Sequence, residues 1–79
     1  MYDKNYLEAL CRKQRREISI TRGLINKAKI DTVCTMLVTR DAEAIGKHQD
    51  FLRDLSVKER MIDEFERNVE HAERFLKTL

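Results

Sequence analysis

The chain has 79 residues, no proline and two glycines; 38% of its residues are charged and 42% are hydrophobic. This composition disfavours disorder, which needs low hydrophobicity, and predicts a single, mostly helical domain with short connections. The longest apolar run, Met36–Val38, is too short to cross a membrane, and nothing resembles a signal peptide. We therefore expect a cytoplasmic protein with two reduced cysteines.

The first predicted helix spans about residues 3–28. Apolar side chains recur there on one half of a helical wheel, namely Tyr2, Tyr6, Leu7, Leu10, Cys11, Ile18, Ile20, Leu24, Ile25 and Ala28. Gly23 falls on the opposite side, where it destabilises a helix without forcing a break. A continuous helix is thus expected, the alternative being a helix that ends at Gly23.

The second predicted helix spans about residues 32–54. Ile30, Val33 and Leu37 point away from the first stripe, which predicts a turn near 29–32 with Asp31 as N-cap. Apolar spacing then continues to Leu55 without a turn at Gly46. The main alternative is a break at 39–41, where Thr39, Arg40 and Asp41 form a cluster typical of helix caps.

The third predicted helix spans about residues 57–78. Ser56 followed by Glu59 has the spacing of a capping box, which would start the helix there. The apolar residues share an arc of about 140°, and we expect this arc to form an oligomer interface through Met61, Ile62, Phe65, Val69, Ala72, Leu76 and Leu79. The predicted fold is all-α: an antiparallel hairpin or bundle of two or three helices that associates into oligomers.

Charge is distributed unevenly along the chain. Residues 1–30 carry eight basic and three acidic side chains, whereas residues 31–79 carry eight basic and eleven acidic ones. The densest basic face contains Arg12, Arg15, Arg16 and Arg22. It is interpreted as a solvated helix surface, with nucleic-acid phosphates, an acidic partner protein or the acidic half of a second copy as alternatives.

Residues 39–55 resemble a helix-turn-helix in part. Ala42 lies four residues before Gly46, and apolar residues lie just before that glycine and six and nine residues after it. The resemblance implies a turn at Gly46 and a second helix that directs Gln49 and Arg53 toward DNA bases. The motif usually has an apolar residue directly after the glycine, where this chain has Lys47.

The sequence contains no recognisable catalytic or metal-binding motif. Cys11, Cys34, His48 and His71 are the soft-ligand candidates, and none lies within four residues of another. We expect no enzyme, metal or cofactor. The expected function is that of a small helical interaction module (an adaptor, inhibitor or regulator) acting as an oligomer; the alternative is a DNA-binding regulator with the C-terminal helix as dimeriser.

Overall fold

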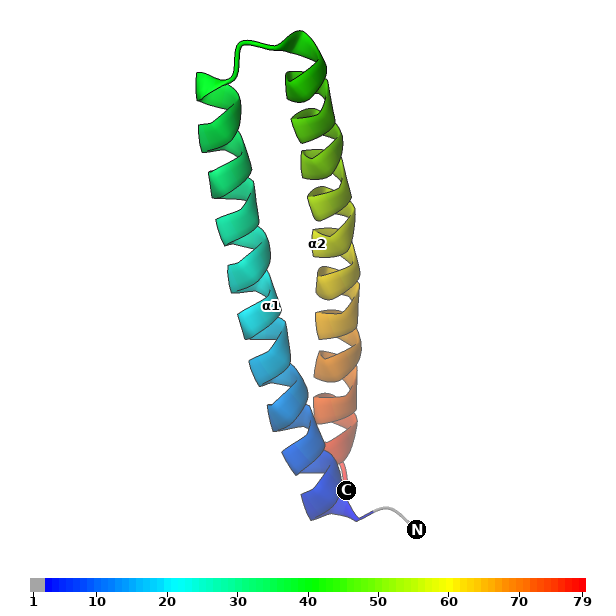
Figure 1. The fold of residues 1–79 in the computed structure, drawn as a ribbon. Helices are drawn as coiled ribbons and strands as arrows, with labels where there is room; N and C mark the ends of the chain where they lie inside the picture. The colour runs from blue at the N-terminus through cyan, green and yellow to red at the C-terminus, as the bar shows by residue number, and fades with distance from the viewer. Residues whose placement is uncertain (1–2) are drawn as a thin grey trace.

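The chain folds into one long antiparallel helical hairpin. The computed structural model describes residues 3–79, in which α1 spans Lys4–Val38 and α2 spans Ala42–Lys77. The molecule measures 59 × 15 × 15 Å, and the helices lie side by side with a short connection at one end (Figure 1). This confirms the all-α class and the helical hairpin, formed by two helices rather than three.

Helix α1 passes straight through the region where a turn was predicted. Asp3 caps its first turn by accepting hydrogen bonds from the backbone amides of Asn5 and Tyr6. The turn predicted near 29–32 is wrong: those residues are helical, and the Thr32 hydroxyl donates to the Ala28 carbonyl at 2.7 Å. The apolar stripe changes phase because Ile30, Val33 and Leu37 are exposed on α1 while buried Thr32 continues the contact with α2.

The chain reverses at Thr39–Asp41, the alternative position for a break. Thr39 is the C-cap of α1, and its hydroxyl donates to the Thr35 carbonyl. Asp41 is the N-cap of α2, where its carboxylate accepts from the Glu43 amide. Only Arg40 lies between the two capping residues, so the connection is short and tightly constrained.

Helix α2 joins the second and third predicted helices into one. Ser56 does not start a helix; its hydroxyl donates to the Leu52 carbonyl one turn earlier, so the predicted capping box is wrong. Gly46 is also helical, and neither glycine of the chain has a positive φ. The turn that the helix-turn-helix resemblance implies at this glycine is therefore absent.

One residue per heptad is buried where the two helices meet. The buried positions are Ile18, Ile25 and Thr32 on α1 and Leu55, Val69 and Leu76 on α2, and the half-buried Cys11 and Ile62 belong to the same two series of residues spaced by seven. Residues seven apart lie nearly above one another on a helix, so these positions form a narrow seam of the coiled-coil kind. No side chain among residues 3–79 is completely buried, and within the same residues no helix is long and apolar enough to cross a membrane.

Replacing Gly46 with alanine should stabilise the hairpin by up to about 1 kcal/mol, because glycine disfavours a helix interior. A Cβ at Gly46 would meet no atom within 4 Å, and the same holds at Gly23, whose alanine variant is the matched control. Both variants should raise the urea midpoint. A loss of stability in Gly46→Ala alone would indicate a turn at this glycine.

Leu55→Ala should lower the free energy of unfolding by about 2–5 kcal/mol, since it leaves a cavity in the seam. Leu55 is 5% exposed, whereas Leu37, the control for the same substitution, is 80% exposed. Leu37→Ala should change stability by less than about 0.5 kcal/mol. Equal losses in chemical denaturation would contradict the location of the seam.

Candidate functional site

A ladder of interhelical ion pairs runs along one side of the seam. Its three steps start from basic residues seven positions apart on α1, and all three acceptors lie on α2 (Arg15–Glu73, Arg22–Glu66 and Lys29–Glu59). The Arg15 Nε donates to a Glu73 oxygen at 2.8 Å, and the Lys29 Nζ lies 2.8 Å from a Glu59 oxygen. The ladder thus pairs the basic half of the chain with the acidic half inside one molecule.

The ladder perturbs the titration of Arg15, Arg22 and Glu73. The hydrogen bond from Arg15 lowers the pKa of Glu73, and it likewise raises the pKa of Arg15 itself. A second carboxylate, Asp63, accepts from Arg22 at 2.6 Å and is the main cause of the raised pKa of that guanidinium. These side chains remain partly exposed, so each pair adds little stability on its own and serves mainly to align the helices.

An apolar face lies on the other side of the seam. Three shallow adjoining grooves between the helices define it, lined outside the seam by Leu7, Leu10, Gln14, Thr21, Lys58, Met61, Phe65, Asn68, Ala72 and Phe75. Met61 is 63% exposed and Phe65 is 41% exposed. Lys58 is the single charged side chain in these grooves, so the face is suited to apolar contact.

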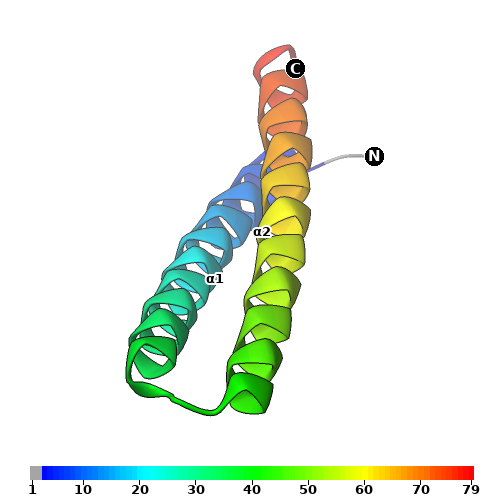
Figure 2. The ribbon, with the colours of Figure 1, turned by 90° about the horizontal axis from the view of Figure 1, so that it is seen from above.

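The apolar face continues toward the connection. Leu24 lies two heptads beyond Leu10, with the exposed Glu17 one heptad between them, and Phe51 lies two heptads before Phe65, which places these residues on the same side of their helices. Leu24 and Phe51 are also exposed. The two helices form a single layer in both views, and no described residue covers this face (Figures 1 and 2).

The interface predicted from sequence divides into two sets in the structure. Val69 and Leu76 are buried against α1, and Ile62 is half-buried beside them. Met61, Phe65, Ala72 and Leu79 are exposed. The sequence could not separate these sets, because both fall within one apolar arc of α2 and only the position of α1 distinguishes them.

The predicted basic face divides in the same way. Arg15 and Arg22 bind carboxylates of α2, whereas Arg12 and Arg16 are exposed. Of the two candidate DNA-contacting residues, Gln49 is exposed and Arg53 donates to Asp50 one turn earlier on the same helix. The intramolecular ladder therefore occupies two of the four arginines that could have met phosphates.

A second apolar patch near the connection was not recognised from sequence. It consists of exposed residues on the last two turns and a half of α1, namely Ile30, Val33, Cys34 and Leu37. Their spacing of three, four and seven residues is that of a helical stripe. The signal was present in the phase change at residues 29–32, which we attributed to a turn.

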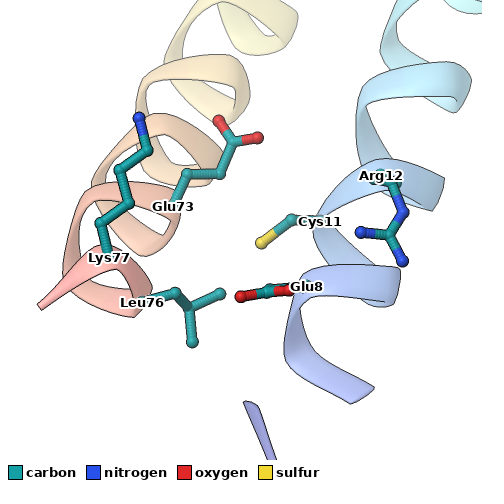
Figure 3. A pocket seen from close by; sticks show the side chains of 6 residues that line it. All are labelled: Glu8, Cys11, Arg12, Glu73, Leu76 and Lys77. Atoms are coloured by element: carbon teal, nitrogen blue, oxygen red, sulfur yellow. The ribbon is translucent and has the colours of Figure 1, made fainter. Parts of the chain in front are cut away.

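A small polar pocket lies near the ends of the chain. Glu8, Cys11 and Arg12 line it from α1, and Glu73, Leu76 and Lys77 line it from α2. Figure 3 shows the Cys11 sulfur directed toward α2, with the Glu8 carboxylate and Leu76 approaching each other below it. Both cysteines are free thiols, and in residues 3–79 no cluster of three His, Cys, Asp or Glu side chains could hold a metal ion.

Comparison of the chain with protein-family models, curated proteins and solved structures finds no match in any of the three.

Acid should weaken the hairpin partly through Glu73. Because its pKa is lowered in the folded state, this carboxylate stabilises the fold above its unfolded pKa, and that contribution is lost as the pH falls through the folded pKa. Urea midpoints of the wild type should therefore drop below about pH 4.5 more steeply than those of Glu73→Gln. Glu64→Gln, a change at an exposed carboxyl of α2, should keep the wild-type slope; equal slopes in all three proteins would contradict this role.

Proposed function

We propose that this chain is a small, non-enzymatic protein-interaction module that acts as an oligomer through the apolar face. The observation that supports this most strongly is the exposure of large apolar side chains in adjoining grooves on one side of the hairpin. Contiguous apolar surface of this kind usually marks a site of protein association. Adaptors, inhibitors and regulators are the classes of protein that such a module suits.

The distribution of charge supports a protein partner over nucleic acid. Binding to DNA requires basic side chains that are free to neutralise phosphates, but Arg15, Arg22 and Lys29 already pair with carboxylates. The apolar face presents mainly aromatic and aliphatic side chains, together with the uncharged Gln14, Thr21 and Asn68 and one lysine. Such a surface gains free energy by excluding water.

The arrangement of reactive side chains supports a non-enzymatic role. Cys11 lies near the ends of the chain, whereas His48 lies on the second turn of α2, close to the connection at the other end of the hairpin. A thiol activated by histidine needs the imidazole within hydrogen-bond reach, and these two side chains lie toward opposite ends of the hairpin. The neighbours of Cys11 in its pocket are carboxylates, basic side chains and a leucine.

Met61→Glu should abolish protein binding through the apolar face, because a carboxylate buried in an apolar contact loses its hydration without a partner. Val57→Glu is the matched control: it lies one turn earlier on α2, is 52% exposed and lines none of the grooves. Immobilised wild type and both variants would be exposed to an extract of the expressing cells and to the untagged chain. Proteins retained by the wild type and Val57→Glu but lost with Met61→Glu are the expected result.

Each protein retained in this manner would then be purified and titrated by calorimetry. Burial of apolar surface should give a negative heat-capacity change with the wild type and with Val57→Glu. Retention that is identical in all three proteins, the untagged chain included, would contradict the proposed function.

A further inference from the structure

We infer that the occupant of the apolar face is a second copy of this chain, so that two hairpins pair face to face into a four-helix bundle. This inference rests on the proposed function and specifies the partner at that same surface. Three properties of the structure support it: the exposed area, the shape of the single layer, and the charge left on the face.

The hairpin exposes more surface than is typical of a folded monomer of its mass. Its accessible surface is 6421 Å², about 1,400 Å² more than a folded 9.4 kDa monomer is expected to expose. Covering that excess on both copies would bury roughly 2,800 Å² in total, which is within the range of permanent homodimers. The excess surface is therefore of the size that one symmetric partner could cover.

The single layer also leaves each helix with one neighbour. The apolar arc of α2 is about 140° wide, yet only Leu55, Val69 and Leu76 are buried against α1. A second hairpin laid over the face would give every helix two neighbours, as in bundles of four helices. Phe65 and Met61, which are now on the surface, would then be in the interior.

The charge left on the face favours a copy of the same chain over a charged partner. The ladder pairs three of the eight basic side chains of residues 1–30 with carboxylates of α2, and these pairs lie on the opposite side of the seam from the apolar face. The grooves themselves carry mainly aliphatic and aromatic side chains, with the uncharged Gln14, Thr21 and Asn68 among them and Lys58 as their one charge. A self-complementary apolar surface is what an isologous dimer requires.

Sedimentation equilibrium of the purified full chain at micromolar concentration tests this pairing. The wild type and Val57→Glu should both sediment at twice the 9.4 kDa mass of one chain. Met61→Glu should weaken association by roughly 100-fold or more, since its carboxylate would lie unpaired in the bundle. Leu24→Glu, the corresponding change on α1, should act in the same direction.

A variant that loses its partner could also unfold, so the melting temperature of the wild type is measured as a second test. The melting temperature of the wild type should rise with protein concentration, because association stabilises the folded state by mass action. A monomer mass at 100 µM together with a melting temperature independent of concentration would overturn the pairing. If such a monomer still retained another protein through Met61, the role as a protein-interaction module would stand, whereas its proposed oligomeric state and the self-pairing would be wrong.

A different assembly would also overturn the inference. If the wild type formed a dimer or a larger species that Val57→Glu disrupted as strongly as Met61→Glu, the contact would lie outside the apolar face. A trimer or tetramer sensitive to Met61→Glu alone would refute the pairing of two hairpins.

Discussion

The fold depends on a seam in which each helix buries about one side chain per heptad. Ile18 and Ile25 on α1 and Val69 and Leu76 on α2 lie in this seam, and no side chain in the described chain is completely enclosed. Burial on this scale is at the lower limit for a domain of fewer than 80 residues. The narrowness of the seam explains why so much apolar surface remains outside it.

The two sides of the seam have different properties. On one side, Arg15, Arg22 and Lys29 form ion pairs with carboxylates of α2, and these pairs favour the antiparallel arrangement of the helices. On the other side, the neighbouring positions are apolar or uncharged and polar apart from Lys58, and no ion pair between residues 3–79 crosses the seam there. The hairpin is therefore a layer with one charged edge and one apolar face, and association is directed to that face.

Local patterns in the sequence predicted the helices well and their ends less well. The expected continuity through Gly23 is confirmed, and the cap-like cluster at Thr39–Asp41, considered as an alternative, is where the chain turns. Ser56 and Asp31 have the right chemistry for caps but lie in mid-helix. A serine can cap a helix N-terminus, but within a helix it can also donate a hydrogen bond to the carbonyl one turn earlier, as Ser56 does. Only the packing of the whole helix decides between these two roles.

The pairing of the helices was less accessible from sequence. Treating the C-terminal stripe as a helix of period 3.6 placed Phe65 in one arc with Val69, although Phe65 is 41% exposed in the single chain and Val69 is buried. A period of seven was present in the charges at 15, 22 and 29 and at 59, 66 and 73. Aligning the basic series of α1 with the acidic series of α2 would have predicted the ladder. Which residues of the apolar arc of α2 contact α1 and which lie on the apolar face depends on how the helices pack, and no local sequence pattern contains that information.

The repetition of the ladder makes the alignment of the helices ambiguous in one respect. Sliding α2 by one heptad, about 10.5 Å, would bring Arg22 opposite Glu73 and Lys29 opposite Glu66, and it would keep heptad positions facing each other in the seam. Sliding it the other way would instead set Glu8 against Glu73. Neither the charges nor the seam alone thus selects a unique alignment; the three-residue connection does, since it is too short to permit either shift. By the same periodicity, matched gains or losses of seven residues in both helices would leave the remaining contacts intact, so the length of this hairpin is free to vary in whole heptads.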